Sequence, residues 1–169
     1  SFLNMQIVEF TRSDDQRRLD RVAWAARKQG KEFDSRIRLE VMNDFRRDGV
    51  AAQPPSYPST LLRHDKAADE WRSDLRLDGQ EVLPFAMTSN ATVVACNDNG
   101  PFPLYETDEY GFNNPAGLWK GGKIKVVTIG DSFTAGYCVP TEKTIAANLR
   151  RFYPGTVNLG ISTIGPLGG

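Results

Sequence analysis

The chain of 169 residues has few of the residue types and patterns that point directly to a function. It has one histidine, two cysteines and equal numbers of basic and acidic residues, 21 of each, so its formal net charge is zero. A balanced charge gives no overall field to attract nucleic acid or an anionic membrane surface, and we therefore expect no nucleic-acid partner. No apolar stretch approaches the length of a membrane-spanning helix, and residues 1–10 lack the length and flanks of a signal peptide.

Signatures of cofactors are also missing. The loop after the most apolar run contains neither Gly-Lys-Ser/Thr nor Gly-x-Gly-x-x-Gly, the patterns of mononucleotide and dinucleotide sites. The two cysteines, Cys96 and Cys138, have no histidine neighbours, so we expect no metal. They are either a disulfide formed in an oxidising compartment or two buried thiols. Cys138 as a nucleophile is a weaker alternative, because no base lies near it in the sequence.

Charge is distributed unevenly along the chain. Residues 1–80 carry 29 charged side chains, whereas residues 81–169 carry only 13. This shift predicts a boundary near residue 80, with a charged helical region and a proline-rich connector before it. Because the chain opens without Met and closes on a Gly-rich run, we expect it to be part of a longer protein. That expectation leaves room for a membrane anchor or signal upstream of Ser1.

Two amphipathic helices are predicted in the first half of the chain. Residues 13–16, Ser-Asp-Asp-Gln, have the form of a capping box and lead into a helix that ends at Gly30. A second helix is predicted from about Asp34 to Gly49. The apolar faces consist of Leu19, Val22, Ala23 and Ala26 in the first helix and of Ile37, Val41 and Phe45 in the second. The dense Arg and Asp faces are interpreted as solvated surface.

The middle of the chain predicts a connector followed by a hairpin. Residues 54–58, Pro-Pro-Ser-Tyr-Pro, cannot continue a helix and favour an extended path. His64 follows among charged neighbours, which predicts a solvated side chain rather than a catalytic one. Residues 92–96 and 102–105 flank an Asn-Asp-Asn-Gly turn, which is typical of a β-hairpin. Two prolines, at positions 101 and 103, place its second arm at an edge.

The most informative stretch is residues 123–136, KIKVVTIGDSFTAG. Its β-branched residues predict a short buried strand of a parallel sheet. Gly130-Asp131-Ser132 then ends the strand and favours a helix start, so a serine lies at the carboxyl end of the strand with N–H groups free to bind an oxyanion. Residues 141–150 predict a helix, and residues 157–159 predict a second parallel strand. This β-α-β unit places Gly160 beside Ser132.

Residues 130–136, GDSFTAG, resemble the nucleophile block of the GDSL/SGNH hydrolase superfamily, and residues 157–162, VNLGIS, resemble its second block. The resemblance implies the start of a flavodoxin-like three-layer α/β domain with a parallel sheet, preceded by the helical region and the hairpin. It implies Ser132 as the nucleophile and an oxyanion donor, and Gly160 as a second N–H donor. Asp131 and Asn158 take supporting roles. The family's Asn and Asp-x-x-His blocks have no match, so we expect residues 1–169 alone to be inactive.

A further stretch, residues 105–115 (YETDEYGFNNP), resembles one found ahead of the nucleophile strand in extracytoplasmic SGNH-like proteins of bacterial polysaccharide pathways. This resemblance places Asp108, Asn113 and Asn114 at the rim of the active site. The alternative is that these residues cap and turn the chain into the sheet. The resemblance also implies a periplasmic or membrane-anchored location in preference to the cytoplasm, and an acyl ester of a small molecule or saccharide as substrate.

The sequence is therefore interpreted as a serine esterase or acyltransferase that works through an acyl-serine intermediate, with no metal or organic cofactor. Two alternatives stay open. One is a non-catalytic carbohydrate-binding or assembly module with the same fold, and the other is a doubly wound domain that binds phosphate or flavin at the Gly/Ser/Thr loop. The catalytic interpretation depends on one geometric condition: Ser132 must lie at the top of its strand, with Gly160 next to it.

Overall fold

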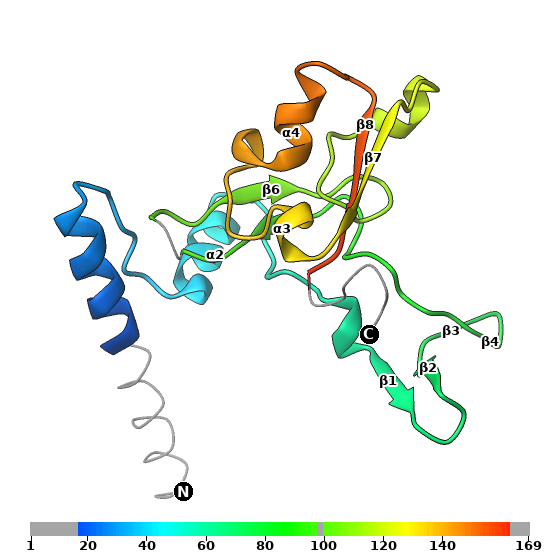
Figure 1. Ribbon diagram of the computed structural model, residues 1–169. Helices are drawn as coiled ribbons and strands as arrows, with labels where there is room; N and C mark the ends of the chain where they lie inside the picture. The colour runs from blue at the N-terminus through cyan, green and yellow to red at the C-terminus, as the bar shows by residue number, and fades with distance from the viewer. Residues whose placement is uncertain (1–16, 98–99, 163–169) are drawn as a thin grey trace, which may run out of the picture.

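The computed structural model describes residues 17–97 and 100–162 (Figure 1). Helices lie at the start and near the end of this part of the chain with a run of strands between them, and the strands form four two-stranded sheets, so the fold class is a mixed α/β one. Three of the sheets are antiparallel and one is parallel. Within the described ranges, no helix is both long enough and apolar enough to cross a membrane.

The first predicted helix is present over residues 17–28. Its fully buried side chains are Leu19, Ala23 and Ala26, and Val22 is half-buried. Gly30 takes a φ of 65°, and the Lys31 N–H donates to the Ala26 carbonyl, which ends the helix as the glycine predicts. The predicted capping box at residues 13–16 lies outside the described residues.

Helix α2 (Arg38–Arg47) begins later than predicted. Asp34 is not part of it, because its carboxylate accepts hydrogen bonds from the backbone N–H and the guanidinium of Arg36 and so forms a turn. Ile37 is the N-cap and is 46% exposed, so its predicted place on the buried face is wrong. The helix ends before Gly49, which has a φ of 82°, as predicted. Its buried residues are Val41 and Met42.

As predicted, the helix does not continue through the proline-rich stretch, and residues 54–57 are neither helix nor strand. A short 3-10 helix and two antiparallel hairpins follow it: η1 (Pro58–Thr60), β1 (Leu62–Asp65) with β2 (Glu70–Ser73), and β3 (Arg76–Leu77) with β4 (Gln80–Glu81). Sequence reasoning does not predict these hairpins, because their side chains are mostly exposed and lack a clear apolar alternation. The boundary predicted near residue 80 falls inside β4.

The hairpin predicted in the second half is confirmed as β5 (Thr92–Val94) and β6 (Leu104–Glu106). Residues 98–99 of its turn lie outside the described residues. Gln53 forms a parallel bridge to Val93, so β5 has neighbours on both sides and β6 is the edge. Two apolar clusters surround β5: Val41, Met42, Ala52 and Val94 with Phe45, Val50 and Phe102, and Val93, Ala95 and Tyr105 with Met87. Segments before and after residue 80 therefore share a core.

The β-α-β unit is also present. It consists of β7 (Val126–Gly130), α3 (Ser132–Ala135), α4 (Ile145–Arg150) and β8 (Thr156–Gly160). β7 and β8 are parallel, with Val126 opposite Thr156 and Gly130 opposite Gly160. In Figure 1, α3 and α4 lie on the same side of the two strands. The described residues thus show the parallel pair and one helical layer.

The helix predicted at residues 141–150 is divided in two. The first part is the 3-10 turn η3 (Thr141–Lys143), and α4 follows it. Thr144 separates them because its hydroxyl accepts a hydrogen bond from the Ala147 N–H at 3.2 Å, the geometry of an N-cap. Within α4, Ile145 is 52% exposed and Ala146 is buried.

β7 is not the buried strand that its β-branched residues predict. Val127 is 47% exposed and Ile129 is 66% exposed, whereas Val126, Thr128 and Gly130 on the opposite face are half-buried. Among the residues that the structure describes, β7 pairs only with β8, and α3 packs on the half-buried face. The pattern predicts the strand correctly but not its burial, because burial depends on which other elements cover the strand.

Candidate functional site

Ser132 lies at the corner that the sequence predicts. β7 ends at Gly130, Asp131 is the N-cap and Ser132 is the first residue of α3. The Asp131 carboxylate accepts a hydrogen bond from the Phe133 N–H at 3.0 Å, and the Asp131 carbonyl accepts one from the Ala135 N–H at 2.9 Å. Ser132 itself is half-buried. Its position at the carboxyl end of β7 therefore leaves part of the residue accessible.

Two glycines allow α3 to pack directly on the strand ends. A Cβ on Gly130 would lie 2.2 Å from Oγ1 of Thr134, and a Cβ on Gly160 would lie 2.2 Å from the backbone nitrogen of Ala135. This close approach leaves no room for a side chain at Gly160, and room at Gly130 only if the Thr134 side chain moves. The Ile161 N–H also donates to the Gly130 carbonyl at 2.9 Å. Ser132 and Gly160 consequently lie at adjacent strand ends.

The N–H of Gly160, the predicted second oxyanion donor, has a partner inside the chain. It donates to Oδ1 of Asn158 at 2.9 Å. Asn158 is 1% exposed, and its Nδ2 is buried without a hydrogen-bond partner. The Asn158 side chain thus fixes the tip of β8. The Gly160 N–H can reach an oxyanion only when Asn158 Oδ1 shares or releases it.

Asp108 is the centre of a buried hydrogen-bond network. It is 0% exposed. Its Oδ1 accepts from the N–H groups of Tyr110 and Phe112, each at 2.9 Å, and its Oδ2 accepts from Trp119 Nε1 at 2.7 Å and Asn114 Nδ2 at 2.8 Å. A carboxylate with four such donors has its hydrogen-bonding capacity satisfied by the protein. Asp108 therefore organises the loop that precedes β7.

Asn114 closes the outer edge of β8. Its Nδ2 donates to the Asn158 carbonyl at 3.0 Å, and its Oδ1 accepts from the Asn158 N–H at 2.8 Å. The side-chain amide thereby makes the two hydrogen bonds that a neighbouring strand would make at this point. Arg150 also donates to Oδ1 of Asn114. Burial lowers the pKa of the Arg150 guanidinium, and the nearby Asp108 opposes that shift.

Asn113 extends this network to α3, because its Nδ2 donates to the carbonyl of the last α3 residue at 3.0 Å. Asp108, Asn113 and Asn114 are 0%, 5% and 3% exposed. Their contacts fit the alternative in which they anchor the chain to the sheet, and their place at the active-site rim stays a prediction. Sequence reasoning misses Arg150 and Trp119 as members, because neither position carries a local signal of its distant partner.

The structure joins Cys96 and Cys138 in a disulfide. Their Cα atoms are 5.0 Å apart, and 42 positions separate them in the sequence. The bond connects the loop after β5 with the chain that follows α3, so it links the hairpin to the β-α-β unit. Of the two states that the sequence leaves open, the structure has the disulfide. A nucleophilic Cys138 needs a free thiol, which this pairing removes.

The single histidine is far from Ser132. His64 lies on β1, its Nε2 is 3.2 Å from the Asp69 carboxylate, and its ring packs against Trp71. Figure 1 shows β1 and α3 well apart. Since the chain has no other histidine, residues 17–97 and 100–162 bring no imidazole to Ser132. That residues 1–169 alone are inactive stays a prediction.

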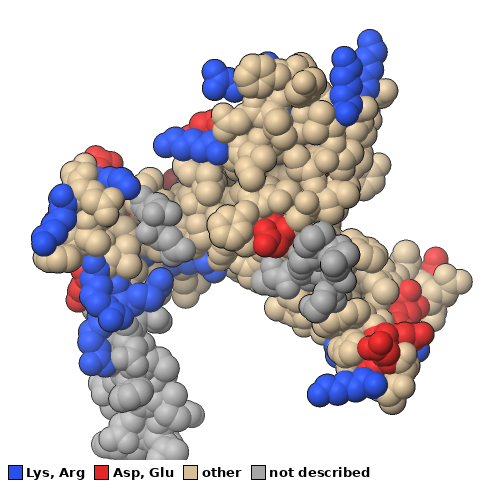
Figure 2. All heavy atoms as spheres, viewed as in Figure 1, with Lys and Arg blue, Asp and Glu red and all other residues tan. Residues whose placement is uncertain are grey.

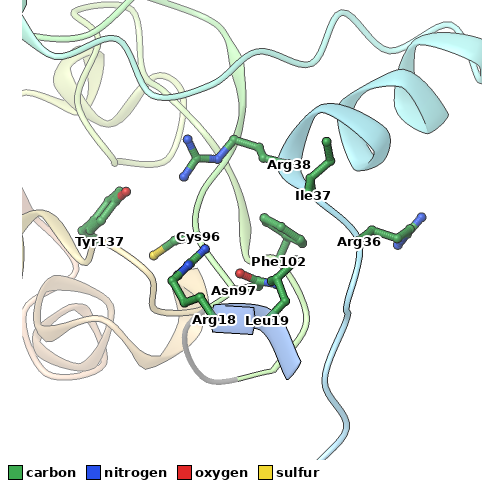
Figure 3. Close-up of a pocket in the computed structure, with 9 residues that line it drawn as sticks. All are labelled: Arg18, Leu19, Arg36, Ile37, Arg38, Cys96, Asn97, Phe102 and Tyr137. Atoms are coloured by element: carbon green, nitrogen blue, oxygen red, sulfur yellow. The ribbon is translucent and has the colours of Figure 1, made fainter. Parts of the chain in front are cut away.

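A cavity of about 370 Å³ lies beside the disulfide rather than at Ser132 (Figure 3). It is lined by Arg18, Leu19, Arg36, Ile37, Arg38, Cys96, Asn97, Phe102 and Tyr137. Its arginines already have partners: Arg36 pairs with Asp34, and Arg38 Nε donates to the Ala95 carbonyl at 3.0 Å. The cavity is therefore not an open anion site. The space beside Gly160 is much smaller, about 10 Å³, roughly the room that one water needs.

Among the residues that the structure describes, no three His, Cys, Asp or Glu side chains are grouped so that they could hold a metal ion. Comparison of the chain with protein-family models, with curated proteins and with solved structures finds no match.

Proposed function

We propose that this chain carries the nucleophile side of an SGNH-type serine esterase or acyltransferase. The observation that carries the proposal is the corner at Ser132. This residue begins a helix capped by Asp131 at the tip of β7, and Gly160 lies at the adjacent tip of β8. The proposal includes the finer fold, a flavodoxin-like three-layer domain in which the parallel sheet continues beyond the two described strands.

In the proposed reaction, Ser132 Oγ attacks the carbonyl carbon of an acyl ester while a base takes the hydroxyl proton. The base returns that proton to the leaving alcohol, and the acyl group stays on the serine until water or another hydroxyl accepts it. The N–H groups of Ser132 and Gly160 donate to the tetrahedral oxyanion once Asn158 shares the second of them. No metal or organic cofactor takes part.

The proposed substrates are O-acylated saccharides, and the proposed location is extracytoplasmic. The Cys96–Cys138 disulfide supports the location, because such bonds persist in oxidising compartments. The saccharide rests on the resemblance of residues 105–115 alone. The general base is proposed to come from outside residues 1–169, because His64 lies on β1 and already faces Asp69.

A non-catalytic saccharide-binding or assembly module is the second candidate. Specific contacts favour it: Asn158 already occupies the Gly160 N–H, and the space beside Gly160 has room for about one water. In that case Asp131 and Ser132 serve only to begin α3. The module does not form an acyl-serine, so covalent labelling distinguishes the two candidates.

A fluorophosphonate probe provides the test. In the parent protein extended past Gly169, we expect the probe to label Ser132, as located by mass spectrometry, and the Ser132→Ala variant to stay unlabelled. Ser35→Ala, which removes an exposed hydroxyl, is the matched control and should label normally. Residues 1–169 alone should label about a hundredfold more slowly, because general-base help is absent.

Two results would count against the proposal. No labelling of the folded parent protein would support the non-catalytic module. Labelling of residues 1–169 at the rate of the parent would show that the base lies within these residues.

A further inference from the structure

A second cavity, of about 570 Å³, lies beside the first helix. The helix contributes Ala23 and Arg27 to its lining, residues 31–35 contribute the segment that follows, and Pro101 completes it. This volume is in the range of small-molecule sites, about 300–1,000 Å³. Figure 1 shows the first helix well apart from α3, so the cavity is separate from the candidate site at Ser132.

Basic side chains are concentrated around this cavity, although the formal net charge of the whole chain is zero. Residues 17–31 contain six basic side chains and one acidic side chain. Figure 2 shows Lys and Arg side chains gathered over the first helix. Arg21, Arg27 and Lys31 are exposed, and the ion pairs of the described ranges do not include them. Unlike the arginines beside the disulfide, they can therefore pair with an anion.

An exposed tryptophan lies among these cations. Trp24 is 60% exposed, and Nζ of Lys28 lies 4.0 Å from the centroid of its ring. Arg21, Trp24 and Lys28 are three and four residues apart, so they share one face of the helix. The ammonium group occupies one face of the indole ring in a cation–π contact. The other ring face offers a flat apolar surface, against which the C–H groups of a sugar ring can stack.

The lining of the cavity distinguishes between kinds of anionic ligand. Arg27 and Lys31 supply positive charge, and the exposed side chains of Glu32 and Ser35 supply hydrogen-bonding oxygens next to them. Guanidinium groups bind carboxylates in a bidentate manner, and a Glu carboxylate accepts hydrogen bonds from hydroxyl groups. A nucleic-acid backbone or a layer of lipid phosphates has a denser negative charge, which Glu32 repels. The lining therefore suits a ligand that carries both carboxylates and hydroxyl groups.

We propose that this cavity and Trp24 form a binding site for an acidic oligosaccharide, one whose sugars carry carboxylates. Arg27 and Lys31 bind the carboxylates, Glu32 accepts hydrogen bonds from hydroxyl groups, and Trp24 stacks on a neighbouring sugar ring. The ligand class follows from the charges and the lining of the cavity and does not rest on a reaction at Ser132. The site is therefore compatible with an esterase and with a non-catalytic module.

Isothermal titration calorimetry of residues 1–169 with trigalacturonate, a carboxylated trisaccharide, tests the proposal. We expect binding that weakens as salt is added, because salt screens exposed charges. Maltotriose, which has no carboxylates, should bind at least about tenfold more weakly. Arg27→Glu places a like charge beside the ligand and should weaken binding of trigalacturonate about tenfold. Arg151→Glu makes the same charge change at the exposed C-cap of α4, outside the cavity, and should have an effect of less than about twofold.

Two further variants test the aromatic ring separately from the charges. Trp24→Ala should weaken binding about tenfold, and Trp24→Phe, which keeps a ring, should recover part of the loss. Ser132→Ala should bind as the unchanged chain does, so a failure of the proposed reaction and a failure of this site are distinguishable. Circular dichroism checks that each variant keeps its helix content.

Several results would overturn the proposal. One is no binding of trigalacturonate at millimolar concentration. Others are equal losses in Arg27→Glu and Arg151→Glu, or unchanged binding by Trp24→Ala. Tighter binding of a single-stranded oligonucleotide or of phosphatidylglycerol vesicles, if Arg27→Glu removes it, would also overturn the proposal, because the cations would then serve phosphate groups.

Discussion

Gly130 and Gly160 show how single residues set the geometry of this site. Neither has a positive φ, so backbone freedom does not explain them. Each lies where a side chain would enter α3: at Gly130 the obstacle is the Thr134 hydroxyl, and at Gly160 it is the backbone of Ala135. A hydroxyl can move to another rotamer, but a helix backbone cannot move alone. Gly160 is therefore the stricter of the two requirements.

Gly160→Ala should consequently destabilise the protein. The new methyl group would lie 2.2 Å from the Ala135 nitrogen, so α3 must shift away from β8, and overpacking of this kind costs about 1–3 kcal/mol. Gly121→Ala is the matched control, because Gly121 has no positive φ and no heavy atom within 4 Å of an added Cβ. Urea denaturation should give a change within about 0.5 kcal/mol for the control. Equal losses in both variants would show that α3 does not rest on Gly160.

At the residue level, the sequence predicts interactions between neighbouring residues but not those between distant ones. Asp131 and Ser132 are predictable as cap and first helical residue, because the preference of Asp for an N-cap acts within three residues. The hydrogen bond from the Gly160 N–H to Asn158 is not predictable, since Asn158 could equally point its amide elsewhere. Arg150 bonding to Asn114 spans 36 positions and depends on the whole fold.

At the level of elements, the two strands of the parallel sheet have different outer edges. Asn114 covers β8 with its side-chain amide, whereas β7 exposes its edge and an apolar face. Among the described residues, the open edge of this sheet is therefore that of β7, where a further strand can pair. The period of the sequence predicts both strands and cannot predict this asymmetry, because an asparagine that imitates a strand leaves no periodic pattern.

The hydrogen bonds of Asn114 and Asn113 predict stability losses of different size when each residue is replaced. Asn114→Ala removes hydrogen bonds to both backbone groups of Asn158 and to Asp108, and leaves these buried groups without that partner. We expect a loss of about 2–4 kcal/mol in the free energy of unfolding. Asn113→Ala is similarly buried but removes one bond, to the Ala135 carbonyl, and should cost about 1–2 kcal/mol. Chemical denaturation measures both, and a larger loss for Asn113→Ala would contradict the role given to Asn114.

Helix starts illustrate the same limit in another way. Both α2 and α4 are predicted as helices, and both begin about four residues after the predicted start. In α2, Asp34 bonds to Arg36 and forms a turn, and in α4 the Thr144 hydroxyl caps the Ala147 N–H. Each short polar side chain competes with the helix for a backbone N–H. The apolar period cannot register this competition, which depends on a single hydrogen bond.

In the whole molecule, segments from both sides of the predicted boundary near residue 80 pack together. The predicted boundary near residue 80 cuts β4, and α2 packs with β5 in one apolar cluster. The disulfide then joins the loop after β5 to the β-α-β unit. α2 therefore packs with the second half of the chain, whereas the exposed hairpins β1–β4 supply no member of the clusters around β5. The domain boundary itself stays a prediction.

Hydrogen exchange should reveal this arrangement. Amides of β5 and β8 lie where side chains such as Val93, Val94 and Val157 are 0% exposed, so they should open only with the whole fold. In β1–β4, Trp71 and Leu77 are 43% and 68% exposed, and these hairpins supply no member of the two clusters around β5. Their amides should exchange about a hundredfold faster, as measured by mass spectrometry of peptic peptides. Equal protection of β1–β4 and β5 would instead place the hairpins in the same cooperative unit, because amides that open together exchange together.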